Sequence, residues 1–360
     1  MGELQFIFVH GLSGWGRYDS RYSRMPYWGM RGGDLLAFLR EKGFACYAAS
    51  VSPTGSAWDR ACELYAQLAG TRVDYGEAHS REYRHERYGR DFSDDPLIPS
   101  WDGDTRLVLL GHSFGGTTVR LFSELLANGD EKERETSAED LSPFFAGGQG
   151  EKVRALVTLT SPMNGTTAYD LSADPEFRPE SVWVPLGSRL FAKVMKRGTR
   201  PKTDGRDERD YAGYDMHLDR AKEMNARMQL LPHVRYYSVP CSKTERQADG
   251  TFRRGKGMEP LYAATSCRIG AWTGKTRGGM TVDESWLEND GLVNTVSAKA
   301  PLGDPRKDFD PEDIPAGIWN VFPVYPGDHM SLQGGLFRKH DIRPFYLELL
   351  ETIRKAEENK

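Results

Sequence analysis

Residues 107–116 have the sequence LVLLGHSFGG, and this stretch decides the fold of the chain. Four apolar residues lead into the motif G-x-S-x-G, and apolar residues at helical spacing follow it. The pattern predicts a buried strand, a sharp turn and a helix. In such a turn Ser113 needs strained backbone angles, for which Gly111 and Gly115 leave room. We expect its hydroxyl above the helix N-terminus, where backbone N–H groups favour negative charge. The alternative is a glycine-rich connection without chemistry.

A second glycine-rich turn follows the first predicted strand. Leu4–Val9 is a short, almost wholly apolar run, as expected for a strand buried on both faces. Residues 10–16, HGLSGWG, come directly after it. In an α/β-hydrolase fold, such a turn supplies one backbone N–H of the oxyanion hole, and the residue after the serine supplies the other. These donors would be Leu12 and Phe114, unless residues 10–16 form an ordinary tight turn.

Strand and helix patterns alternate along the rest of the chain. Ser56 is the expected N-cap of one helix, with Asp59 three residues on as a capping-box acid. The sequence predicts strands at residues 44–51, 152–160, 234–239 and 318–324, and helices at residues 33–42, 56–68 and 342–355. This alternation favours a mostly parallel central sheet with helices on both faces, in a single α/β-hydrolase domain over residues 1–360.

Composition and charge narrow the classes of function. With 38% hydrophobic residues, the 360-residue chain can bury a large core. The net charge of −4 gives no reason to expect a nucleic-acid partner. No apolar run reaches the roughly 18 residues that would predict a membrane-spanning helix. No signal peptide precedes the first strand, so we expect a secreted protein whose signal is absent from this chain, or a cytoplasmic one.

Two segments interrupt the regular pattern. Residues 73–99 are polar, rich in Arg, Tyr and His, and without periodicity. His79 and His85 there, with carboxylates such as Asp59, Asp74 or Glu77, would suit a zinc site that orders a long loop. The alternative is a pair of surface histidines. Residues 171–209 carry prolines, glycines and cationic residues, which suits a cap or lid as well as a mobile linker.

The catalytic partners of Ser113 should lie further along the chain, because this fold carries its acid and then its histidine after the nucleophile. His329 follows the last predicted strand, whereas His340 lies in a charged segment and is expected to be solvated. Asp290, in an Asn-Asp-Gly turn, is the preferred acid. Its competitors are Asp283, Asp304, Asp308, Asp310, Asp313 and Asp328. In this interpretation His329 takes the proton of Ser113, and Asp290 orients His329.

Longer strings identify a family. They are residues 10–16, 58–63 (WDRACE), 65–68 (YAQL), 73–76 (VDYG), 286–291 (WLENDG), 293–297 (VNTVS) and 328–329 (DH). In all of them the chain resembles the bacterial lipases of family I.5, the staphylococcal and thermoalkalophilic Geobacillus-type lipases. The likeness runs through most of the chain and is far more specific than G-x-S-x-G alone. The resemblance implies the α/β-hydrolase fold and a lipase-like activity.

The resemblance also implies a structural zinc ion held by two aspartates and two histidines. The corresponding ligands here are Asp59, His79, His85 and Asp210, the last being the first of two aspartates that flank residues 211–214. Such a closed tetrahedral shell is structural. It would pin the segment of residues 73–99 to the region after the cap.

Two departures from the family affect what is expected. The family's calcium site uses a glutamate two residues after the catalytic histidine and a later Asp-Pro pair. Here that position is Ser331, and no Asp-Pro follows before Asp341, so calcium is not expected. The cap is also shorter than in the thermophilic lipases. A more open serine favours soluble esters, short acyl chains or bulky polyesters over strict activation at a lipid interface.

The sequence as a whole therefore predicts a secreted carboxylic-ester hydrolase of the lipase or esterase type, without an organic cofactor. Its substrates would be lipids or other esters, reached through transient contact with a lipid interface or in solution. An acyltransferase or a thioesterase could use the same Ser113, Asp290 and His329. A non-catalytic binding protein of this fold is the alternative of a different class, although the intact set of three residues argues against it.

Overall fold

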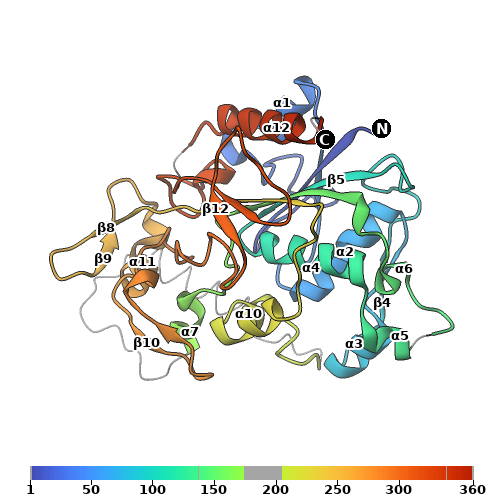
Figure 1. Ribbon diagram of the computed structural model, residues 1–360, viewed down its shortest axis with the longest axis horizontal. Coiled ribbons are helices and arrows are strands. Elements are labelled where there is room, and N and C mark those ends of the chain that lie inside the picture. Colours follow the sequence, from blue (N-terminus) through green and yellow to red (C-terminus); the bar gives the residue numbers. More distant parts are fainter. Residues whose placement is uncertain (1, 137, 174–204, 338, 359–360) are drawn as a thin grey trace.

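A seven-stranded sheet crosses the middle of the molecule (Figure 1), and its strand order is β12-β13-β7-β6-β5-β1-β2. Every neighbouring pair in this sheet is parallel. The computed structural model describes residues 2–136, 138–173, 205–337 and 339–358. The sheet strands are β1 (Leu4–Val9), β2 (Ala45–Ala49), β5 (Arg106–His112), β6 (Val153–Leu159), β7 (Arg235–Val239), β12 (Arg306–Asp308) and β13 (Trp319–Val321). The predicted α/β-hydrolase architecture, with a mostly parallel sheet, is confirmed.

The central strands are apolar on both sides because both sheet faces are covered. In β1, Phe6 and Phe8 point into one core, and Ile7 and Val9 point into the other. Successive side chains of a strand alternate between faces, so a nearly continuous apolar run fits a strand between two helical layers.

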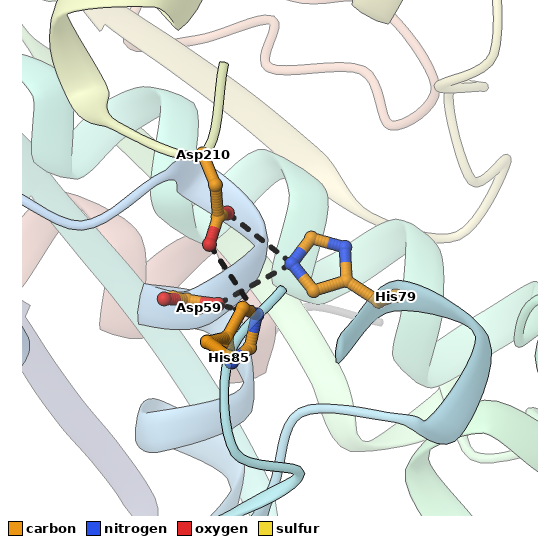
Figure 2. A group of neighbouring side chains, drawn as sticks. All are labelled: Asp59, His79, His85 and Asp210. Carbon is orange, nitrogen blue, oxygen red and sulfur yellow. Dashed lines mark hydrogen bonds and ion pairs between the residues drawn. The ribbon is translucent and has the colours of Figure 1, made fainter. Parts of the chain in front are cut away.

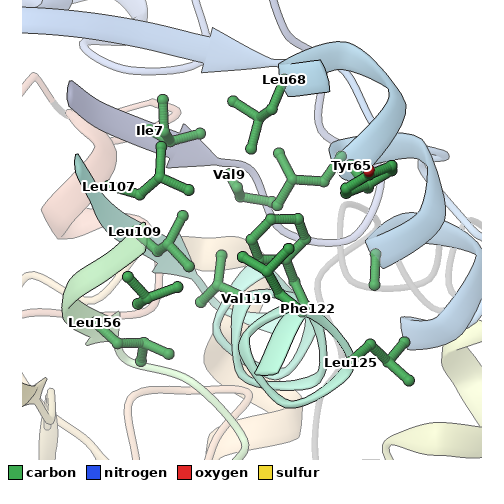
Figure 3. Packing of buried hydrophobic residues seen from close by; sticks show 14 of the residues in the cluster. Ile7, Val9, Tyr65, Leu68, Leu107, Leu109, Val119, Phe122, Leu125 and Leu156 are labelled. Carbon is green, nitrogen blue, oxygen red and sulfur yellow. The ribbon is translucent and has the colours of Figure 1, made fainter. Parts of the chain in front are cut away.

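Helices α2 (Ala57–Ala69) and α4 (Phe114–Asn128) cover the first face. Figure 3 shows their apolar side chains packed over β1, β5 and β6. The labelled contacts come from Ile7, Val9, Leu107, Leu109 and Leu156 on the strands, and Tyr65, Leu68, Val119, Phe122 and Leu125 on the helices. This packing fixes the start of α4, and with it the turn that carries Ser113, against the end of the sheet.

Helices α1 (Leu35–Glu41) and α12 (Arg343–Glu358) cover the opposite face. They lie side by side in Figure 1. Leu35, Leu36 and Leu39 of α1 and the apolar stripe of α12 bury Phe6 and Phe8. The two helices predicted at residues 33–42 and 342–355 therefore form, with ends shifted by a few residues.

The segment of residues 73–99 is more regular than its sequence suggests. Strands β3 (Arg72–Asp74) and β4 (Tyr88–Asp91) pair antiparallel and enclose helix α3 (Glu77–Tyr83). These elements are too short to show a periodicity in the sequence. Helix α5 (Glu131–Thr136), which lies in an acidic run, packs against α3.

The remaining described α-helices and strands comprise one short helix before β6 and several elements after it. They are α6 (Pro143–Ala146), α7 (Thr167–Ala173), α9 (Ala212–Asp215), α10 (Leu218–Asn225), α11 (Ala263–Ile269) and the antiparallel pairs β8 (Thr244–Arg246) with β9 (Phe252–Arg254) and β10 (Gly274–Lys275) with β11 (Thr281–Val282). The strand predicted at residues 318–324 is limited to β13. Most of the predicted cap, residues 174–204, lies outside the described residues. Within the described part of the chain, no helix is long and apolar enough to cross a membrane.

Candidate active site and metal centre

The turn between β5 and α4 places Ser113 in a strained conformation. Its φ is 54° and its ψ is −129°, which a residue with a side chain rarely adopts. A Cβ on Gly111 would lie 2.4 Å from the backbone of Gly115, and a Cβ on Gly115 would lie 2.3 Å from the carbonyl oxygen of Val9. The two glycines are therefore required, as the motif predicts. Ser113 is only 7% exposed and stands at the start of α4.

The three side chains predicted as a catalytic set meet at this turn. His329 Nε2 lies 2.8 Å from Ser113 Oγ, and His329 Nδ1 lies 2.8 Å from Asp290 Oδ2. The backbone N–H of His329 also donates to the carbonyl oxygen of Asp290, at 2.9 Å. Residues separated by more than 200 positions thus form a hydroxyl–imidazole–carboxylate arrangement, which is able to activate a nucleophile.

Asp290 is fully buried, and its carboxylate is well supplied with hydrogen-bond donors. Oδ1 accepts from the backbone N–H groups of Leu292 (2.9 Å) and Val293 (2.7 Å). Oδ2 accepts from His329 and from the hydroxyl of Thr160. Burial opposes ionisation, but His329 and these hydrogen bonds hold the pKa of Asp290 below its usual range. A charged Asp290 can therefore stabilise a protonated His329.

The predicted oxyanion donors flank the serine. Ser113 directly precedes Phe114, the first residue of α4, and Leu12 lies in the turn after β1. That turn is tight: Gly14 N–H donates to the carbonyl oxygen of Gly11 at 3.2 Å, and Ser13 has a φ of 58°. Among the described residues, the N–H groups of Leu12 and Phe114 donate to no acceptor of the chain.

The competing histidine and aspartates have other surroundings. His340 is half-buried rather than solvated. Asp328 accepts hydrogen bonds from Glu259 N–H and from the hydroxyl of Ser331. Asp283 caps a short helix, Asp304 accepts from Trp319, and Asp308, Asp310 and Asp313 are exposed. The position where the resembled family has a calcium-binding glutamate, Ser331, is therefore engaged with Asp328.

A second cluster joins the four predicted zinc ligands (Figure 2). Asp59 lies on α2, His79 on α3, His85 between α3 and β4, and Asp210 just before α9. Their candidate ligand atoms all lie within 4.8 Å of one another. His79 Nε2 is 3.4 Å from Asp59 and 3.2 Å from Asp210, and His85 Nε2 is 3.3 Å from Asp210. The four residues can therefore hold one metal ion.

The geometry of this cluster fits a tetrahedral ion. Zinc–ligand bonds of about 2.0–2.1 Å at tetrahedral angles place ligand atoms about 3.3 Å apart. The three spacings given above are close to this value, and His85 Nε2 lies 3.9 Å from Asp59 Oδ1. Asp59 Oδ1 and His85 Nε2 are buried and lack a hydrogen-bond partner within the described chain, as expected for atoms that bind an ion. Although burial opposes a charge on His79, Asp210 and Asp59 raise its pKa to about 9. The cluster thus attracts a cation.

Residues around the cluster were not predicted from the sequence. Arg206 contacts the Oδ2 atoms of both Asp59 and Asp210, and Asp210 Oδ2 is also the oxygen that faces His85. Trp58 stacks on His79 with ring centres 4.9 Å apart. Glu133, the buried member of the acidic run, accepts the backbone N–H of His79 at 2.8 Å and so anchors α3. These contacts join segments far apart in the sequence, so the sequence did not indicate them. The cationic character of residues near 206 was its only related feature.

Comparisons with known proteins show similarity to bacterial lipases. A sequence family described as "Lipase-like, C-terminal domain" matches residues 3–183. Lipase 2 of Staphylococcus aureus is 30% identical over 391 positions, which cover 99% of this chain and 55% of that lipase. The chain therefore spans about half the length of the curated relatives that it matches.

Two solved structures share the fold over nearly the whole chain. EstA from Clostridium botulinum has a TM-score of 0.83 and 27% identity, and the match covers 98% of this chain and 87% of that one. Staphylococcus hyicus lipase has a TM-score of 0.81 and 28% identity, with 99% and 97% covered.

Proposed function

Because the chain belongs to the lipase family that includes the staphylococcal lipases, we propose that it is a serine carboxylic-ester hydrolase. The observation that carries the proposal is the pair of 2.8 Å contacts that join His329 to Ser113 and to Asp290. A carboxylate, an imidazole and a hydroxyl in this order activate a nucleophile for acyl transfer.

Catalysis proceeds in two stages. Ser113 Oγ attacks the acyl carbon of the ester while His329 Nε2 accepts the hydroxyl proton, and Asp290 stabilises the resulting imidazolium. The N–H groups of Leu12 and Phe114 donate to the carbonyl oxygen as it becomes negative. His329 then passes its proton to the leaving alkoxide, which leaves an acyl group on Ser113. Water, deprotonated by His329, then attacks this acyl group. The bond between the acyl carbon and Ser113 Oγ breaks, His329 returns the proton to Oγ, and the acid is released.

The cluster of Asp59, His79, His85 and Asp210 would hold a zinc ion in this proposal. Four protein ligands close the shell, so the ion's contribution is structural and leaves no position for substrate. The four ligands come from α2, the α3 segment and the residues just before α9, so the site joins these elements. Of these elements, α2 and α9 pack next to α4, and Ser113 directly precedes α4.

The ester class is tested with p-nitrophenyl esters from acetate to palmitate, with and without a lipid interface. Wild-type protein should hydrolyse p-nitrophenyl butyrate, and Ser113→Ala should lose that activity while keeping its unfolding temperature. Turnover that survives in Ser113→Ala would refute the proposal. A polyester film added to the same series tests the polymer substrates that a short cap would admit, and tributyrin tests a lipid substrate.

Two other activities fit the same residues and are separated by product analysis. An acyltransferase would give mainly the transferred ester when an alcohol competes with water, and a thioesterase would prefer an acyl thioester over the matched oxygen ester. The contact of Ser113 with His329 argues against a purely binding protein, which has no need of an activated hydroxyl. Secretion remains a prediction from the resemblance, to be checked by fractionating the producing cells.

A further inference from the structure

A chain of buried hydrogen bonds runs beneath Ser113, from the turn after β1 to the loop of His329. The backbone N–H of Gly11 lies 3.0 Å from the hydroxyl oxygen of Tyr27. That oxygen lies 2.7 Å from His112 Nδ1, and His112 Nε2 lies 2.8 Å from the carbonyl oxygen of His329. Tyr27 is 4% exposed and His112 is 1% exposed, so water does not compete for these bonds.

Each of these hydrogen bonds has one possible direction from donor to acceptor. The carbonyl oxygen of His329 can only accept, so His112 carries a proton on Nε2. Burial lowers the pKa of His112 to about 3, and nearby His329 adds to this effect, so the ring is neutral. Its Nδ1 then accepts the proton of the Tyr27 hydroxyl, whose oxygen accepts the N–H of Gly11. Bonds that all run one way reinforce one another.

These hydrogen bonds end on groups whose positions matter for the proposed reaction. Gly11 precedes Leu12, the predicted oxyanion donor, and His112 precedes Ser113. His329 is the base itself. A Cβ on Gly11 would lie 2.8 Å from Ser113 Cβ and 3.1 Å from the Tyr27 hydroxyl, so this turn passes directly against the serine. Three loops from distant parts of the sequence are therefore linked by two side chains.

From this arrangement we propose that Tyr27 and His112 are positioning residues, which fix the oxyanion turn and the His329 loop relative to Ser113. The inference rests on the proposed esterase function. Neither side chain contacts the reacting atoms; each acts through a backbone group that belongs to the turn or loop it holds. Without the Tyr27 hydroxyl, Gly11 N–H and His112 Nδ1 lose their shared partner, and the two loops lose their link.

The Tyr27 ring is held independently of its hydroxyl. It packs edge-on against Trp15 and Trp28, with ring centres 5.6 Å and 5.4 Å away. Tyr27→Phe should therefore keep the packing and remove only the hydrogen bonds. Tyr236 offers a matched control, because it is also buried and its hydroxyl accepts the backbone N–H of Leu231 at 2.8 Å. That bond lies in the core on the other face of the sheet and is not part of this hydrogen-bond network.

The test compares Tyr27→Phe with Tyr236→Phe in steady-state hydrolysis of p-nitrophenyl butyrate and in inhibition by butylboronic acid, which mimics the tetrahedral intermediate. A displacement of about 1 Å costs up to about 100-fold, so kcat of Tyr27→Phe should fall about 10- to 100-fold with KM nearly unchanged. The inhibition constant of the boronic acid should rise by a similar factor. Tyr236→Phe should match wild type in both readouts.

A second measurement does not depend on activity or on the folding of a variant. In wild-type protein, ¹⁵N NMR of the His112 ring should show a protonated Nε2 and an unprotonated Nδ1 through the neutral pH range. The inference is overturned if His112 carries its proton on Nδ1, or if Tyr27→Phe keeps the wild-type kcat and boronate affinity. Inactive wild-type protein would instead refute the proposed function, so the two failures are distinguishable.

Discussion

Thr160 makes an unusual contact with the proposed catalytic acid. Its φ is 45°, in the left-handed region that a β-branched residue rarely enters, and it is 1% exposed. Such a conformation costs about 1–3 kcal/mol and persists where the surrounding structure imposes it. The residue follows β6, and its hydroxyl donates to Asp290 Oδ2, the same oxygen that binds His329 Nδ1. The strained backbone thus aims a donor at the carboxylate.

We predict that Thr160→Val lowers both activity and stability. The change keeps the shape of the side chain but removes one of the four hydrogen bonds described above for the Asp290 carboxylate. A hydrogen bond to a charged group contributes about 1.5–3 kcal/mol, so the free energy of unfolding should fall by about that amount. The other donors keep Asp290 ionised at neutral pH. We therefore expect kcat to fall about 10-fold, through a less well oriented His329.

The assay for this prediction is hydrolysis of p-nitrophenyl butyrate together with unfolding in urea. Thr158→Val is the matched control, because Thr158 is also buried on β6 and its hydroxyl lies 3.4 Å from the carbonyl oxygen of Tyr237, away from Asp290. Thr160→Ser, which keeps the donor, should retain most of the activity. Equal values of kcat for Thr160→Val and Thr158→Val would refute the reasoning.

Three further changes test other parts of the structure. Gly115→Ala places a Cβ 2.3 Å from the Val9 carbonyl oxygen, so unfolding in urea should show a loss of at least about 1–3 kcal/mol; an unchanged midpoint contradicts this. Chelation should lower the unfolding temperature of wild type but not that of His85→Ala. If zinc is present at about 1,000 times its Kd, the free energy of unfolding of wild type should fall by about 4 kcal/mol. Equal responses of the two proteins contradict a structural metal. Burial raises the pKa of Asp215 to about 6, so between about pH 4 and pH 6 the folded state binds a proton that the unfolded state has lost. The free energy of unfolding, relative to that of Asp215→Asn, should therefore fall by up to about 3 kcal/mol between about pH 4 and pH 7. The same pH dependence of urea unfolding in both proteins would contradict this.

Local signals in the sequence predict the parts of the site that depend on local geometry. The strand-turn-helix at Ser113 follows from apolar periodicity and from two glycines that a tight turn requires. His329 and Asp290 follow from their order in the chain and from their positions in turns. Ser56 caps α2 as expected, through a bond from Asp59 N–H at 3.2 Å. The side chain of Asp59, expected as a capping-box acid, instead faces the metal cluster.

The supporting residues could not be predicted, because their roles arise only from contacts between distant segments. Tyr27 lies in the long connection between β1 and α1, and Thr160 directly follows β6. Nothing in the sequence marks either residue or indicates a positive φ at Thr160. Glu133 lies in a run of charges that favours a solvated helix, yet it is buried because two N–H groups of α3 meet its carboxylate. The family resemblance, rather than spacing, identified Asp210 as a ligand.

The central claim is that Ser113 is a nucleophile activated by His329. Reaction with a fluorophosphonate followed by peptide mass spectrometry tests it most directly. We predict a single label on the peptide that contains Ser113, much slower labelling in His329→Ala, and none in Ser113→Ala. A label on another residue, or undiminished labelling of Ser113→Ala, would contradict the account.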